Sequence, residues 1–133
     1  MLRLLRVAVL SVAAAAILTA CSSGSGYPDL DREATATDVL PTDLPESSSA
    51  DFIEGSVRFA GEHDDVEYYL ARRDDFANIC VVAYRSADDW VGGCGGPNGG
   101  FGIGGMGLDV VVAPEGSPEL DEGTRVGTNI VVR

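Results

Sequence analysis

The two-residue alternation of apolar side chains after Glu54 constrains the fold of this chain more than any other feature. Val57 and Phe59 flank Arg58, and residues 66–70 repeat the same alternation. A period of two is typical of a strand with one face buried and the other face in solvent. Turn-forming residues lie between the two runs, so we expect the runs to pair as an antiparallel hairpin.

Two further pairs of apolar runs extend this pattern toward the C-terminus. They comprise residues 79–85 and 90–94 for a second hairpin, and residues 108–113 and 125–132 for a third, with the loop 114–123 inside it. Six short strands with polar turns and no helical period predict a small all-β meander, either a sandwich or a curled sheet. We therefore expect one all-β domain over residues 55–133.

Cys80 and Cys94 lie in the two strands of the second expected hairpin. If they face each other, the numbers of paired residues sum to 174, and Tyr84 then lies opposite Trp90 on the same, buried face. Cross-strand Cα atoms about 4.5–5.5 Å apart suit a disulfide, and closing a loop of about 15 residues stabilises a fold by roughly 3 kcal/mol. A four-residue turn would give a sum of 175 instead, and a bulge among the glycines that follow would then have to restore the pairing.

Residues 92–107 form a segment in which ten of 16 residues are glycine. We expect a mobile loop whose glycines permit positive φ or close backbone approach, and which offers a lip for binding. Residues 102–107 match the dinucleotide pattern G-x-G-x-x-G, and residues 104–112 match one calcium-binding nonapeptide with Asp109. Strand-like residues follow where a dinucleotide site needs a helix, and one nonapeptide supplies at most half a calcium site. We therefore predict no cofactor and no metal.

The single histidine and three acidic doublets lie at expected strand ends. The doublets are Asp64-Asp65, Asp74-Asp75 and Asp88-Asp89. We interpret them as solvated turns because they lack the spacing of an EF-hand. His63 alone does not make a His-rich zinc site, but with Asp64 or Asp65 it is a candidate general base. Tyr84 and Trp90 have a second interpretation as a platform for stacking a sugar, although core packing is the simpler one.

The charged residues exclude several classes of function. All nine basic residues are arginine, so the chain has no lysine for a P-loop, a Schiff base or a lysine general base. With 21 acidic residues the formal net charge is −12. A nucleic-acid partner requires a basic face to neutralise phosphates, which this composition does not supply.

Residues 1–20 have the layout of an export signal. Arg3 and Arg6 precede an uncharged apolar stretch over residues 7–18, and small residues follow it. The apolar stretch is shorter than the roughly 20 residues that span a bilayer, so we expect it to be cleaved rather than retained.

The end of this segment, Leu18-Thr19-Ala20-Cys21, resembles the lipobox of bacterial lipoproteins, and the Arg-only, Ala- and Gly-rich usage is similar to that of small exported actinobacterial lipoproteins. The resemblance implies cleavage after Ala20 by a type II signal peptidase and transfer of diacylglyceryl to the Cys21 sulfur. The protein would then be anchored by lipid on the extracytoplasmic face of the cell membrane. The alternative is an ordinary secreted protein in which Cys21 is incidental.

Residues 21–54 then begin with the lipidated cysteine and continue as an acidic tether rich in Ser and Pro. Such a composition is too polar to offset the entropy of ordering, so we expect a flexible spacer of roughly 30 Å mean reach. A short helix near residues 32–40, lying on the domain and ended by Pro41, is the alternative. Without residues 1–20 the chain has seven basic and 21 acidic side chains, a net charge of −14, so lipid rather than charge must hold it at an anionic membrane.

These observations favour a non-enzymatic envelope module that presents a surface or the glycine-rich segment to a protein or glycan partner. The alternative hypothesis is a small envelope hydrolase that uses His63 and the neighbouring acids. A deep pocket lined by His63 would favour the hydrolase, and a solvent-facing His63 would favour the binding module.

Overall fold

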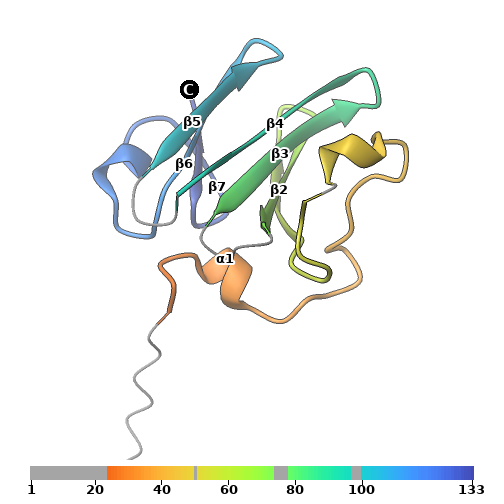
Figure 1. Ribbon diagram of the computed structural model, residues 1–133. Helices are drawn as coiled ribbons and strands as arrows, with labels where there is room; N and C mark the ends of the chain where they lie inside the picture. Colours follow the sequence, from red (N-terminus) through yellow and green to blue (C-terminus); the bar gives the residue numbers. More distant parts are fainter. Residues whose placement is uncertain (1–23, 50, 74–77, 97–99) are drawn as a thin grey trace, which may run out of the picture.

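In the part of the chain that the structure describes, eight short strands form two four-stranded antiparallel sheets that face each other (Figure 1). The computed structural model describes residues 24–49, 51–73, 78–96 and 100–133. Sheet 1 has the order β1-β2-β3-β4 and sheet 2 the order β5-β6-β8-β7. The elements are α1 (Pro28–Asp31), η1 (Glu46–Ser48), β1 (Arg58–His63), β2 (Val66–Arg72), β3 (Ile79–Ser86), β4 (Asp89–Gly95), β5 (Phe101–Gly105), β6 (Leu108–Val112), η2 (Pro118–Leu120), β7 (Thr124–Val126) and β8 (Ile130–Val132). The small all-β fold expected from the sequence is confirmed, and the sandwich is the one of its two expected forms that is observed.

The first expected hairpin is present as β1 and β2. The chain reverses at Asp64 and Asp65, which have φ values of 50° and 62°. A two-residue hairpin turn needs positive φ at both positions, and aspartate tolerates this conformation better than most residues. This doublet is therefore explained by the turn it makes.

The second hairpin has the register deduced from the cysteines. Cys80 pairs with Cys94 and Tyr84 with Trp90, and a disulfide joins the two cysteines across a Cα separation of 4.0 Å. The register shift that reconciles the turn with this pairing lies between Tyr84 and Ser86, beside the turn, rather than among the glycines of β4.

The expected third hairpin is wrong in the extent of its second strand. Residues 125–132 do not form one strand, because the chain turns between β7 and β8, where Gly127 has a φ of 62°. A Cβ at this glycine would lie 2.6 Å from Asp29 Oδ2, so the turn also needs the small residue for space. β6 consequently lies between β5 and β8, and β7 pairs with β8 instead of with β6.

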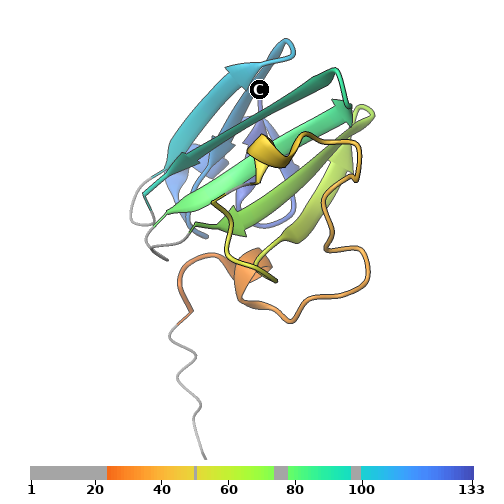
Figure 2. The ribbon, with the colours of Figure 1, turned by 45° about the vertical axis from the view of Figure 1, so that its right-hand side comes forward.

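The glycine-rich segment is not simply a loop, which corrects a second expectation. It contains the end of β4 and all of β5, and these edge strands of the two sheets run side by side (Figure 2). A Cβ at Gly95 would lie 2.5 Å from the Phe101 ring, and one at Gly93 would lie 2.6 Å from Ile103 Cγ2. The side chains of β5 thus occupy the space that side chains on β4 would need. Glycine on β4 therefore lets the two sheets approach each other along these edge strands, and we call this β4–β5 contact the seam.

The space between the sheets is filled by alternate residues of each strand. The largest fully buried strand residues of this core are Val66, Tyr68, Leu70, Ile79, Val81, Val110, Val112 and Ile130. The disulfide and Trp90 lie on the opposite, outer face of sheet 1, which corrects the expectation that they face the core. Cys80 and Val82 are nonetheless buried on that outer face, because residues 43–49 and 51–52 lie over it.

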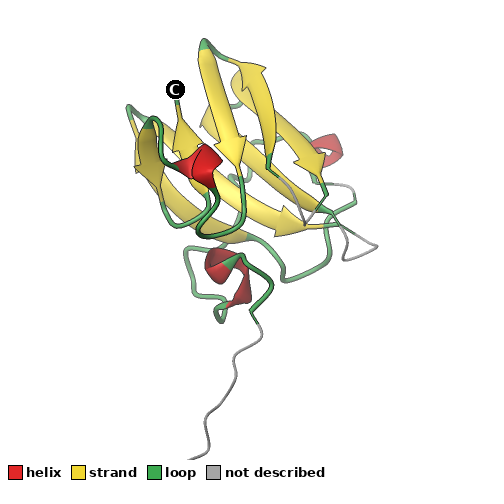
Figure 3. Cartoon of the chain, turned by 90° about the vertical axis from the view of Figure 1, so that its left-hand side faces the viewer, coloured by secondary structure: helices red, strands yellow, loops and turns green. Residues whose placement is uncertain are grey.

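Residues 24–54 differ most from the sequence-based expectation, because residues 24–49 and 51–54 pack on the sandwich instead of forming a flexible spacer. Tyr27 is fully buried and Leu30 is 6% exposed, and both belong to the core cluster. The single turn α1 lies at one end of the two sheets (Figure 3). The polar composition of this segment led to the expectation of a flexible spacer, but a few apolar residues are enough to dock it on the sandwich.

The carboxylate of Asp38 holds this segment to the edge of sheet 1. It accepts hydrogen bonds from Arg32 Nη1 at 2.6 Å and Nη2 at 2.7 Å, from the Thr35 backbone N–H at 2.6 Å and from the Phe59 backbone N–H at 2.7 Å. Arg32 also donates to the Phe59 carbonyl oxygen at 3.1 Å. The pair thus satisfies backbone groups of β1 that an edge strand otherwise leaves open.

We expect Gly95→Ala to lower the free energy of unfolding by about 2 kcal/mol, because the added methyl group overlaps the Phe101 ring. Gly96→Ala is the matched control, since a Cβ there meets nothing within 4 Å, and we expect a change within about 0.5 kcal/mol. Urea unfolding of the three proteins measures both effects. Equal destabilisation by the two substitutions would contradict the close packing of Phe101 on Gly95.

The Arg32 hydrogen bonds hold the pKa of Asp38 far below its usual range. A lowered folded-state pKa contributes stability that is complete above about pH 5 and is lost as the pH falls further. We expect Asp38→Asn to cost about 2 kcal/mol at pH 7. The variant should also lose less stability than the parent between pH 5 and pH 2, as measured by urea unfolding. Asp88→Asn, at an exposed turn position, is the control and should follow the parent curve.

Candidate functional site

A hollow of about 220 Å³ opens on the outer face of sheet 1. We call it the Trp90 hollow. Its lining consists of Ser47, Ser48, Asp51, Phe52, Arg73, Val81, Val82, Trp90, Gly92, Gly93 and Cys94. The floor comes from β3 and β4, and the wall comes from η1 and the chain that follows it.

The wall of the hollow is held in place by contacts at both ends. On one side, the Tyr84 hydroxyl donates to the Asp43 carboxylate at 2.8 Å. On the other side, Phe52 forms a bridge with Arg73, and the Ile53 N–H donates to the Arg72 carbonyl at 2.8 Å. Figure 2 shows η1 lying across the outer side of β3 and β4 between these two attachments.

The floor is hollow because Gly92 has no side chain. A Cβ at this position would lie 3.5 Å from Trp90 Cζ3 and 3.7 Å from Val82 Cγ2, in ordinary contact with both, and 3.3 Å from the Val81 carbonyl oxygen, which is a tighter contact. The alternation of β4 places Trp90, Gly92 and Cys94 on the same face, so a large ring and the disulfide flank the missing side chain. The result is an apolar depression next to the partly buried ring of Trp90.

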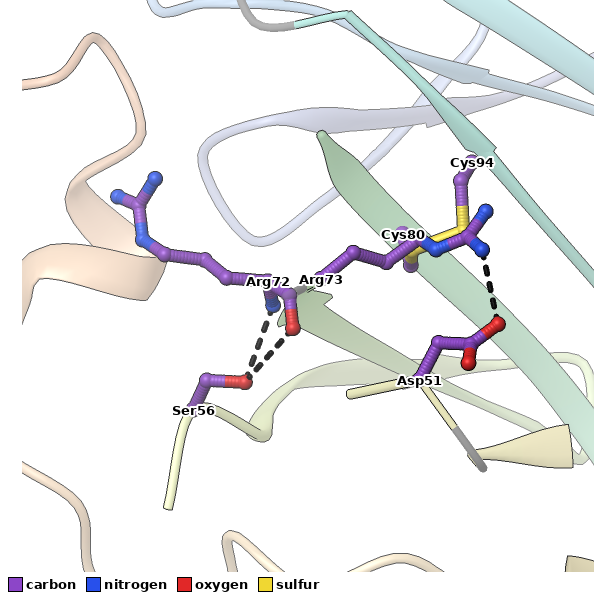
Figure 4. Close-up of a disulfide and its surroundings, with 6 residues drawn as sticks. All are labelled: Asp51, Ser56, Arg72, Arg73, Cys80 and Cys94. Carbon is purple, nitrogen blue, oxygen red and sulfur yellow. Dashed lines mark hydrogen bonds and ion pairs between the residues drawn. A yellow bond between two sulfur atoms is a disulfide. The ribbon is translucent and has the colours of Figure 1, made fainter. Parts of the chain in front are cut away.

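The rim of the hollow is polar and close to neutral. Arg73 Nη2 lies 2.8 Å from Asp51 Oδ2, with the two side chains 39% and 59% exposed. Figure 4 shows Arg73 extending beside the Cys80–Cys94 disulfide toward Asp51. An exposed pair of this kind contributes little to stability, but it offers a donor and an acceptor to a bound molecule. The chemistry of the hollow is therefore that of recognition, with an apolar floor and polar groups at its rim.

His63 lies away from the hollow, at the end of β1. Its Nε2 is 3.2 Å from Asp64 Oδ2, and Asp64 is 83% exposed. The histidine side chain is 36% exposed, and no residue lining the Trp90 hollow is its partner. The structure therefore brings His63 and Asp64 together in a solvated turn.

Tyr84 and Trp90 are paired across β3 and β4, but only Trp90 lines the hollow. The Tyr84 hydroxyl is engaged by Asp43, and this hydrogen bond raises the pKa of Tyr84. Tyr84 and Trp90 therefore do not form a joint stacking platform. Trp90 alone lines the hollow, and Tyr84 instead binds the segment at Asp43.

The motif matches within the glycine-rich segment are accounted for by a hairpin. Residues 102–107 cover β5 and its turn into β6, so a strand follows the glycines where a dinucleotide site requires a helix. Asp109 is exposed and pairs with Gly104 across the same hairpin. Within the described ranges, no three metal-ligating side chains form a cluster.

Several predicted positions lie outside the described residues. Ala20, Cys21 and the doublet Asp74-Asp75 are among them. No helix in the part of the chain that the structure describes has the length and hydropathy to cross a membrane. The disulfide of Cys80 and Cys94 is the predicted site feature that the structure confirms.

Comparison of the chain with known protein families, curated proteins and solved structures gives no match.

The sequence allowed the floor of the hollow to be predicted, but not its wall. The alternation Trp90, Gly92, Cys94 was readable once the register was fixed by the disulfide. The wall comes from a segment of Ser, Pro and acidic residues with no periodicity. No local pattern indicates that such a segment crosses a sheet, because its attachments are to residues at least 19 positions away.

Proposed function

We propose that this protein is a lipid-anchored, non-enzymatic binding module on the outer face of the cytoplasmic membrane, and that the Trp90 hollow is its ligand seat. The observation that carries the proposal is the unfilled apolar floor beside Trp90, with the Arg73–Asp51 pair at its rim. Aromatic side chains in concave, partly apolar sites are typical of ligand recognition.

The position of His63 supports binding rather than hydrolysis. A general base needs a nucleophile or a water held within hydrogen-bond reach and a pocket that holds the substrate. His63 instead pairs with an exposed carboxylate in a hairpin turn. The hollow contains Ser47 and Ser48, but it has no histidine to activate either hydroxyl.

The charge of the domain favours a protein as the partner. A body with a net charge of −14 after signal removal attracts cationic segments and repels anionic polymers. Arginine and lysine side chains of proteins supply cationic charge, and an apolar side chain next to one of them would fit a hollow of 220 Å³. We therefore propose as the ligand an exposed basic segment of another envelope protein, with an apolar side chain next to its basic residues.

The intact mass of protein extracted from membranes tests the anchor. We expect the loss of residues 1–20, the addition of a diacylglyceryl group at Cys21, and the loss of two thiol hydrogens through the disulfide. The variant Cys21→Ser should carry no diacylglyceryl mass and should retain residues 1–20, because both steps need the cysteine. An unmodified Cys21 in membrane-extracted protein would rule out the anchor.

Fluorescence of the single tryptophan tests the hollow, because its emission reports this position alone. We expect fractionated envelope proteins to shift the emission to shorter wavelength, with a response that weakens as salt is added. Gly92→Val fills the floor and should abolish the shift. Gly104→Val, at an exposed strand glycine with no Cβ neighbour closer than 4.0 Å, is the matched control and should preserve it.

Three results would count against this proposal. A shift caused by soluble cell-wall glycan fragments, and not by proteins, would assign the hollow to a glycan. A shift that survives Gly92→Val would place the ligand elsewhere on the domain. Hydrolysis of an envelope substrate that is lost in His63→Ala, while the variant remains folded, would make the protein an enzyme.

A further inference from the structure

We infer that the lipid anchor holds the domain close to the membrane, with the α1 end nearer to the lipid headgroups than the opposite end of the sandwich. This inference rests on the proposed lipidation of Cys21. It concerns a surface, defined here as residues 24–33 with Glu115, and its partner is the phospholipid bilayer. The sequence alone predicted the opposite arrangement, a domain on a long flexible spacer.

The chain is already fixed to the domain at its first described residues. The Ser25 N–H donates to Asp31 Oδ2 at 3.0 Å, and the Ser25 hydroxyl donates to Asp31 Oδ1 at 2.9 Å. Arg72, at the end of β2, donates to the Ser25 hydroxyl at 2.9 Å and to Asp31 at 3.0 Å. These bonds tie the start of the described chain to sheet 1.

The residues that follow are tied to the elements around sheet 2. The Gly26 carbonyl accepts hydrogen bonds from the Glu115 N–H at 2.7 Å and from Asn129 Nδ2 at 3.0 Å. Asp29 Oδ2 accepts from the Thr128 N–H at 2.8 Å, and Tyr27 between them is fully buried. Because both sheets hold residues 25–31, the point where the chain enters the domain is rigid.

The length of chain available to the anchor is therefore short. Cys21 and Ser25 are four residues apart, which in a fully extended chain is at most about 14 Å. β2 has seven residues and thus spans roughly 20 Å between the two ends of the sandwich. The connection is shorter than the domain is tall, so the domain cannot turn its opposite end toward the membrane.

Charge does not supply this orientation. Asp31, Glu33 and Glu115 are exposed at the α1 end, and they oppose adhesion to anionic headgroups. Arg72 at this end is engaged with Asp31. The short covalent connection, rather than attraction to lipid, holds the α1 end at the surface.

The orientation determines where a partner reaches the protein. The turns at 64–65, 87–88 and 106–107 lie at the end of the sandwich opposite α1 and therefore point away from the membrane (Figure 1). The Trp90 hollow lies on the side of the domain, along β3 and β4. A partner would therefore approach the hollow sideways, along the membrane surface.

Energy transfer from tryptophan to a dansyl group on the phospholipid headgroup tests this orientation. The protein is the full chain, purified in lipidated form and reconstituted in phosphatidylcholine vesicles. Trp90→Phe removes the native donor, and a single tryptophan is then placed by Pro28→Trp at the α1 end or by Asp88→Trp at the β3–β4 turn, both at exposed positions. We expect transfer to be several times more efficient from position 28. An insertion of about 20 Gly and Ser residues before Gly24, with a mean span of roughly 25 Å, should remove the difference.

The outcomes separate the two proposals. Protein that carries no lipid by intact mass and does not float with vesicles would overturn the anchor and the orientation together. Protein that floats but transfers energy equally from the two positions, with or without the inserted linker, would overturn the orientation alone and leave the anchor standing. A denatured variant is identified beforehand by the loss of its cooperative urea transition.

Discussion

The buried carboxylate of Asp38 is the contact on which the outer layer of this protein depends. It joins the Arg32 guanidinium to the backbone of β1, and so fixes residues 32–38 along the edge of sheet 1. Residues 24–31 before this clamp are held at one end of the sandwich, and residues 43–49 and 51–52 after it lie over the outer face of β3 and β4. One polar segment that packs on the sandwich thus has two effects. It forms the wall of the Trp90 hollow, and it leaves only a short connection between Cys21 and the domain.

The second constraint is steric and acts where the two sheets meet. Gly93 and Gly95 lie under Ile103 and Phe101, at distances that leave no room for a Cβ. Sheets of a sandwich pack about 10 Å apart when both inner faces carry side chains, and removing side chains from one edge lets the edges approach more closely. The same glycine-rich strand supplies Gly92 on its outer face, where the missing side chain is left open to solvent as the floor of the hollow.

Much of the fold was predictable because strand alternation and disulfide register are local properties. The first two hairpins and the pairing of Cys80 with Cys94 followed from them. β5 was missed because Phe101 and Ile103 alternate with glycine, which has low strand propensity and resembles a loop. The docking of residues 24–49 and 51–54 was missed because two buried apolar side chains and several carboxylates, among them Asp38 and Asp43, attach a polar segment that has no periodicity. The hollow was missed because its wall and floor come from segments distant in the chain.

The disulfide is placed asymmetrically, and this has a consequence for its chemistry. Cys80 is completely buried beneath the covering segment, whereas Cys94 is exposed in the hollow. Thiol–disulfide exchange requires an attacking thiolate to reach one of the two sulfurs, so reductants meet the Cys94 side of this bond first. Any molecule seated in the hollow stands in that path, and occupancy would therefore protect the cross-link from reduction without altering the fold.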